Sequence, residues 1–127
     1  MLIRVFVDYK SEPYGETVIV SVYLTRATLK DAMSFRDYIL DLIKKNYLRI
    51  IVDLSFCDYI DSTFLGALVA SLKKISSLKG DLQLIYNNKA SSMIFEMTNM
   101  NRVFKIHSSL NEALISFGEE PQQEDRI

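Results

Sequence analysis

The hydrophobic pattern at the start of the chain is typical of extended strands. Residues 1–9 (MLIRVFVDY) and 17–24 (TVIVSVYL) are rich in β-branched and aromatic residues. Between them, residues 11–16 (SEPYGE) contain Pro13 and Gly15, residue types that favour turns. This pattern predicts two strands joined by a six-residue loop as an antiparallel hairpin.

After the hairpin, apolar residues recur at helical spacing and in short continuous runs. A helix is expected from about Leu29 to Asn46, and the apolar run at 48–54 predicts a strand buried on both faces. A second helix is expected to end at Gly80, which suits the position after a helix C-terminus. Farther on, the pattern predicts a strand, a helix, a strand and a last helix over residues 82–86, 89–100, 103–106 and 110–117.

The predicted order of elements, β-β-α-β-α-β-α-β-α, defines an α/β fold. Strands that alternate with helices favour a mixed, mainly parallel sheet, here opened by a hairpin and accompanied by about four helices. With 127 residues, the chain is expected to form one domain over residues 1–117. Residues 118–127 (GEEPQQEDRI) contain four acids and one arginine, and we expect them to form a flexible acidic tail.

Charge and composition exclude several functional classes. Fifteen Lys and Arg against sixteen Asp and Glu give a net charge of −1, which argues against nucleic-acid binding. With one Cys and one His, the chain lacks the ligands for a Cys/His zinc site, and we expect no cofactor. Residues 1–10 do not resemble a leader and no apolar run is long enough to span a bilayer, so a cytoplasmic protein without membrane insertion is expected.

The sequence also lacks the common catalytic motifs. It contains no P-loop, GxGxxG, CxxC, HExxH or GxSxG motif. Cys57 has no basic neighbour in sequence and is expected to be a buried, inert thiol. A hydrolase with Ser62 as nucleophile would need His107, the single imidazole, as its base, whereas a surface or partly packed role is expected for this histidine. We therefore expect no enzymatic activity.

The remaining signal is the segment Asp58-Tyr-Ile-Asp-Ser-Thr63, directly before the second predicted helix. Either Asp61 or Ser62 is expected to be the N-cap, a role that is independent of function. A helix N-terminus also accommodates a phosphoryl group, which adds about −1.5 to −2 charge. Residues 50–72 contain three Asp and no Lys or Arg, so a phosphorylated hydroxyl there would repel a partner without disturbing the fold.

Residues 50–85 resemble the STAS domain, the family of bacterial anti-sigma factor antagonists. The resemblance rests on the strand that ends in Asp53-Leu54, the Asp61-Ser62-Thr63 triplet, the Leu65-Gly66 pair and Gly80 before the next strand. Farther on, residues 93–98 (MIFEMT), 103–106 (VFKI) and 110–114 (LNEAL) resemble the end of the family's domain. The resemblance extends over roughly residues 3–117.

The resemblance implies a protein-binding switch that regulates transcription indirectly. In this family, the unmodified antagonist binds a kinase-type anti-sigma factor, which is a serine kinase that phosphorylates the antagonist with ATP. The implied acceptor is Ser62, with Thr63 as the second choice, and a phosphatase would restore the hydroxyl. The implied partner-binding residues are Asp58, Asp61, Ser62, Thr63 and Phe64.

Two positions depart from the family pattern. Phe64 stands where a glycine is usual, and an exposed phenyl ring there would be a plausible binding anchor. The loop of residues 24–28 lacks the family's glycine and aspartate. Two alternatives therefore stay open: an accessory subunit that docks on the ATPase of an ABC-type transporter without phosphorylation, and a subunit of a stressosome-like assembly. The sequence does not predict the oligomeric state.

Overall fold

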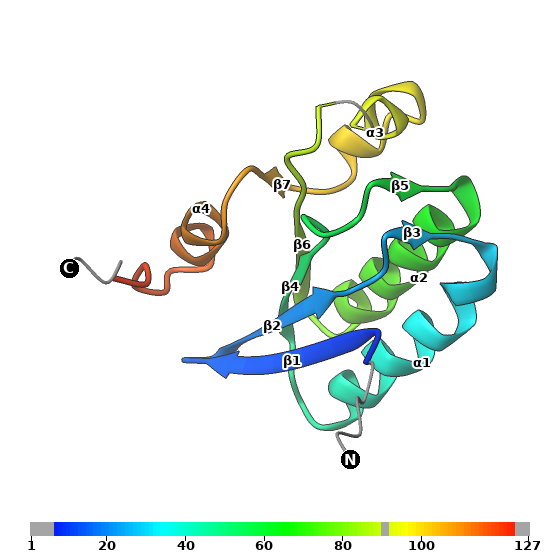
Figure 1. Ribbon diagram of the computed structural model, residues 1–127. Helices are drawn as coiled ribbons and strands as arrows, with labels where there is room; N and C mark the ends of the chain where they lie inside the picture. Colours follow the sequence, from blue (N-terminus) through cyan, green and yellow to red (C-terminus); the bar gives the residue numbers. More distant parts are fainter. Residues whose placement is uncertain (1–6, 90–91, 124–127) are drawn as a thin grey trace, which may run out of the picture.

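A computed structural model describes residues 7–89 and 92–123 (Figure 1). The main sheet has the strand order β1-β2-β4-β6-β7, in which β1 is antiparallel to β2 and all other neighbours are parallel. Its strands are β1 (Tyr9–Tyr14), β2 (Thr17–Val22), β4 (Arg49–Asp53), β6 (Asp81–Ile85) and β7 (Ile106–His107). The helices are α1 (Leu29–Lys44), α2 (Ser62–Ser77), α3 (Met93–Met97) and α4 (Leu110–Ser116), with a 3₁₀ turn at Met100–Arg102.

Helices cover both faces of this sheet (Figure 1). The helices α1 and α2 lie on one face, and α4 lies on the other. Because side chains alternate along a strand, the residues of β4 divide between two cores: Ile50 and Val52 pack with α1 and α2, whereas Ile51 packs with Leu114 and Phe117. The predicted α/β fold is confirmed, as is the expectation that residues 48–54 contain a strand buried on both faces.

The opening hairpin exists, but its first strand and its turn have different bounds from those predicted. Residues 1–6 lie outside the described part of the chain, and β1 runs through most of the predicted loop. Pro13 is accommodated because β1 is an edge strand with no neighbour on its outer side among the described residues. The turn contains only Gly15 and Glu16, between the paired residues Tyr14 and Thr17. Gly15 has a φ of 60°, which a two-residue hairpin turn requires at this position.

The end of α2 also differs from the prediction. Lys79, not Gly80, adopts the left-handed conformation, with a φ of 64°. The glycine is required for a different reason: a β-carbon on Gly80 would lie 2.3 Å from the carbonyl oxygen of Leu48. Because glycine has no side chain, the backbone at residue 80 can lie close to Leu48, the residue before β4.

The last third of the described chain is less regular than predicted. The helix expected over 89–100 consists of α3 and the 3₁₀ turn, and the strand expected at 103–106 is the two-residue strand β7. The last helix is confirmed as α4. No helix among residues 7–89 and 92–123 is long and apolar enough to cross a membrane.

The first half of the expected tail packs against the domain. Glu119 accepts a hydrogen bond from the backbone N–H of Glu16 at 3.1 Å, and the Tyr14 hydroxyl donates to the carbonyl of Glu120 at 2.7 Å. Gln122 is held by reciprocal hydrogen bonds with the side chain of Asn111. These contacts place residues 119–122 against the domain, the flexibility of residues 118–127 stays a prediction, and residues 124–127 lie outside the described part.

Candidate partner-binding site at the start of helix α2

The segment before α2 is fixed by a second, smaller sheet that the sequence did not predict. Strand β5 (Tyr59–Ile60) pairs in parallel with β3 (Arg26–Ala27). The backbone N–H of Asp58 donates to the carbonyl of Thr25 at 2.8 Å, and that of Asp61 donates to Ala27 at 3.0 Å. The segment therefore has a defined position beyond the end of β4.

Asp61 connects the N-termini of two helices. Its Oδ1 accepts a hydrogen bond from the backbone N–H of Phe64 at 2.8 Å, which makes Asp61 the N-cap of α2. Its Oδ2 accepts a hydrogen bond from the backbone N–H of Leu29, the first residue of α1, also at 2.8 Å. Each bond satisfies a helix N–H that has no intrahelical acceptor, so one carboxylate stabilises both helix starts.

Ser62 is the first residue of α2, and its side chain is exposed. Because Asp61 is the N-cap, the Ser62 hydroxyl is not needed to cap the helix, and it forms no hydrogen bond within the described residues. The neighbouring Thr63 is also exposed. Both hydroxyls are therefore accessible to a modifying enzyme, and both lie at a helix start where a phosphoryl group is electrostatically favourable.

The Phe64 side chain is buried, so the expectation of an exposed phenyl ring as a binding anchor was wrong. Its side chain is 0% exposed and contacts the ring of Phe35 on α1, with the ring centroids 4.9 Å apart. Position 64 lies on the helix face that turns toward the α1–α2 core, so a large apolar side chain is buried there. Its φ is not positive, so the helix does not need a glycine at this position.

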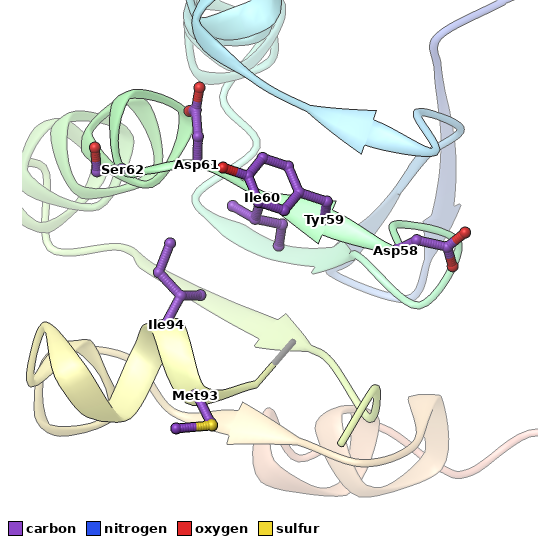
Figure 2. Close-up of a pocket in the computed structure, with 7 residues that line it drawn as sticks. All are labelled: Asp58, Tyr59, Ile60, Asp61, Ser62, Met93 and Ile94. Carbon is purple, nitrogen blue, oxygen red and sulfur yellow. The ribbon is translucent and has the colours of Figure 1, made fainter. Parts of the chain in front are cut away.

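A cleft of about 570 Å³ lies beside Ser62 (Figure 2). One wall is the segment 58–62, and the other is the start of α3. The structure thus brings together Asp58, Asp61 and Ser62, which the sequence had indicated, while Thr63 does not line the cleft. The lining residues are Asp58, Tyr59, Ile60, Asp61, Ser62, Met93 and Ile94.

The sequence did not indicate the contribution of α3 to this cleft. Met93 is 58% exposed, but a methionine at helical spacing is more often part of a core. The position of α3 opposite Ser62 depends on tertiary packing: Phe95 is buried and its ring contacts that of Tyr86 at the end of β6, with centroids 5.4 Å apart. No local sequence pattern could have revealed this arrangement.

Cys57 is buried beneath this segment. Burial, together with the nearby carboxylates of Asp53 and Asp58, raises the pKa of the Cys57 thiol to about 12. The thiol is therefore neutral and unreactive in the folded protein, as the sequence predicted.

His107 lies on the opposite face of the sheet from Ser62. Its Nε2 is 2.7 Å from Oε1 of Gln83, and β7 pairs with Ile85, which packs in the core covered by α4. Ser62 begins α2, which covers the other face. Burial lowers the pKa of the His107 imidazole. Because the two residues lie on opposite faces of the sheet, His107 cannot act as a base for the Ser62 hydroxyl. The described residues also contain no group of three or more side chains that could bind a metal ion.

Comparison with known proteins identifies the family. The family model of the STAS domain matches residues 28–113, so the chain belongs to the STAS domain family. A protein of Thermotoga neapolitana described as a candidate anti-sigma factor antagonist is 31% identical over 100 residues, which cover 78% of this chain and 88% of that protein. A protein of Thermotoga maritima that is 30% identical over 100 residues, which cover 78% of this chain and 88% of that protein, is also described as a candidate anti-sigma factor antagonist, and the family prediction is confirmed.

Solved structures show the same fold. The crystal structure of a candidate anti-sigma factor antagonist from Thermotoga maritima has a TM-score of 0.76 and 28% identity, and the match covers 85% of this chain and 92% of that one. The phosphorylated form of the Bacillus cell fate determinant SpoIIAA has a TM-score of 0.65. That match covers 86% of this chain and 98% of the other, and its 15% identity supports the fold alone.

Proposed function

We propose that this protein is an anti-sigma factor antagonist whose binding to a kinase-type anti-sigma factor is controlled by phosphorylation of Ser62. The observation that carries the proposal is the division of roles between neighbouring residues. Asp61 caps α2 with its carboxylate, while the Ser62 hydroxyl is exposed beside a cleft and has no structural role within the described residues. The names of relatives about 30% identical support the general role.

The position of Ser62 accounts for a switch that leaves the fold intact. A phosphoryl group on Ser62 would lie at the N-terminus of α2, where the helix dipole and free N–H groups favour negative charge. The same group adds about −1.5 to −2 charge beside Asp58 and Asp61 on the surface that the partner covers. The modification therefore acts on the complex by repulsion and bulk, while α2 is preserved.

This mechanism assigns the chain no catalytic role. The anti-sigma factor supplies the ATP and the kinase activity, and a phosphatase removes the phosphoryl group. The protein acts in the cytoplasm and regulates transcription through its partner. Because Phe64 is buried, its ring offers no contact to an anti-sigma factor or to a transporter ATPase, and the alternative of an accessory transporter subunit is left to the capture experiment.

Affinity capture from a lysate of the source organism, with nucleotide present, tests the proposal. The baits are the wild-type protein, Ser62→Asp and Ser76→Asp. Ser76→Asp is the matched control because it adds the same charge at an exposed serine at the other end of α2. We expect the wild type and Ser76→Asp to recover a small ATP-binding kinase and Ser62→Asp to lose it. Equal recovery of a transporter ATPase or of a large assembly by all three baits would contradict the proposal.

A further inference from the structure

The outer edge of β1 is the longer of the two edges of the main sheet (Figure 1). This strand has six residues, whereas β7 at the opposite edge has two. The free backbone groups of such an edge can pair with another strand. We propose that β1 pairs in an antiparallel manner with β1 of a second copy of this chain, about a two-fold axis that passes beside Ser11.

The register of the hairpin shows which backbone groups of β1 point outward. In an antiparallel pair, the N–H and C=O groups of every second residue point toward the neighbouring strand. The carbonyl of Asp8 accepts a hydrogen bond from the backbone N–H of Tyr23 at 2.7 Å, so the even-numbered residues of β1 bond to β2. The backbone groups of Tyr9, Ser11 and Pro13 therefore point away from the sheet.

Antiparallel pairing centred on Ser11 uses these outward groups. Ser11 then lies opposite Ser11 of the second copy, and Tyr9 lies opposite Pro13 of that copy. The two serines exchange a pair of N–H···O=C hydrogen bonds, and the N–H of each Tyr9 donates to the carbonyl of the opposing Pro13. Because proline has no N–H, Pro13 forfeits the return bond at each end but leaves the central bonds intact.

Side-chain charge selects a second copy as the occupant of this edge. Lys10 and Glu12 lie on one face of β1, and both are exposed. Neither has a hydrogen-bond or ion-pair partner among residues 7–89 and 92–123. In the pairing centred on Ser11, Lys10 of each copy lies directly opposite Glu12 of the other. Opposite charges at such positions stabilise a sheet, and the two-fold axis repeats the pair, so the strand is complementary to itself.

The same charges disfavour other alignments of the two strands. A register centred on Lys10 or on Glu12 places like charges directly opposite each other, which is unfavourable. A register centred on Tyr9 places Lys10 opposite Asp8, which lies outside β1, and pairs fewer residues of the strand. Charged residues and proline commonly protect an edge strand from unspecific pairing. In β1 they disfavour misaligned strands and leave the alignment centred on Ser11 open.

The proposed dimer leaves the candidate partner-binding site free. Ser62 begins α2, and β2 separates the edge strand β1 from the inner strands β4 and β6 (Figure 1). The inference goes beyond the proposed function and does not depend on phosphorylation, because no residue of the pairing belongs to that site. Its consequence is that one dimer presents two Ser62 sites.

Analytical ultracentrifugation of the purified full chain tests the pairing through its charges. We expect a reversible dimer for the wild type. Lys10→Glu places acids opposite each other at both ends of the pairing and should raise the dimer dissociation constant at least about tenfold. The double variant Lys10→Glu/Glu12→Lys restores opposite charges and should return within about twofold of the wild type. Lys73→Glu, at an exposed position of α2, makes the same charge change and is the matched control.

A second pair of variants tests the backbone hydrogen bonds. Ser11→Pro removes the outward N–H of the central residue but no bond between β1 and β2, so the hairpin is kept and the dimer should be lost. Ser11→Ala keeps that N–H and should remain dimeric. It is the matched control because both changes remove the hydrogen bond between the Ser11 and Tyr38 hydroxyls at 2.7 Å. Circular dichroism establishes that each variant is folded.

Several results would overturn the inference. A wild-type chain that stays monomeric up to about 1 mM would exclude the dimer. A dimer that Lys10→Glu weakens no more than Lys73→Glu would have another interface. Failure of the double variant to restore the dimer would exclude the register centred on Ser11, since a register centred on Tyr9 keeps Asp8 opposite the new acid. A folded Ser11→Pro protein that dimerises as well as Ser11→Ala would exclude pairing through the backbone.

Discussion

Substitution of Asp61 by alanine should destabilise the protein through two helices at once. The change removes the acceptor for the N–H of Phe64 and the acceptor for the N–H of Leu29. Loss of an N-cap costs about 1 kcal/mol, and a typical second hydrogen bond contributes about 1 kcal/mol net. Because Asp61 is half-buried and water partly replaces the lost carboxylate, we use these central values and expect a loss of about 2 kcal/mol.

Urea unfolding followed by circular dichroism measures this loss. With an m-value of about 2 kcal/mol per M, the midpoint should fall by about 1 M while the m-value stays the same. Asp61→Asn keeps one carbonyl acceptor and should lose about half as much. Asp37→Ala, an exposed acid in the middle of α1, is the control and should have little effect.

Two results would refute this reasoning. If Asp61→Ala shifted the midpoint no more than Asp37→Ala, the carboxylate would not stabilise the helix starts. If Asp61→Asn were as destabilising as Asp61→Ala, the charge rather than the number of acceptors would be responsible. In the first case, Ser62 would have to be reconsidered as a capping residue.

Three further predictions test the core and the titrating groups. Phe64→Ala should lower the unfolding free energy by about 3–5 kcal/mol in urea, because a fully buried ring leaves a cavity; a loss below about 1 kcal/mol would mean that the ring is exposed. Cys57 should resist iodoacetamide at pH 8 until the protein unfolds, and rapid native alkylation would contradict its burial. His107 has a lowered pKa when folded, so the unfolded state binds its proton more readily. Stability should therefore fall as the pH drops below about 6.5, with an NMR midpoint for His107 below that value; a higher midpoint would contradict the burial effect.

The sequence predicted the parts of the fold that have a clear periodicity. The helical stripe from Leu29 and the continuous apolar run of β4 both appear where expected. The pairing of β3 with β5 was not predictable, because two-residue strands have no periodicity. The first strand lies later in the chain than predicted because Pro13 favours a turn in the sequence pattern, whereas an edge strand tolerates it.

The sequence predicted the part of the site that lies in one continuous segment of the chain. Asp58, Asp61 and Ser62 are adjacent in sequence and also line one cleft. The sequence did not predict the burial of Phe64, because this burial depends on which face of α2 is turned toward α1. There the Phe64 ring contacts the ring of Phe35. The second wall of the cleft comes from a helix about thirty residues away, which local patterns do not reveal.

The most direct test of the central claim is to locate the phosphoryl group and measure its effect on binding. The purified protein is incubated with the captured kinase and ATP, the modified residue is identified by mass spectrometry, and the affinity of the modified protein for that kinase is measured. We predict that phosphorylation occurs at Ser62, is absent in Ser62→Ala, persists in Thr63→Ala and weakens binding strongly. Modification at another residue, or unchanged affinity after modification of Ser62, would contradict the account.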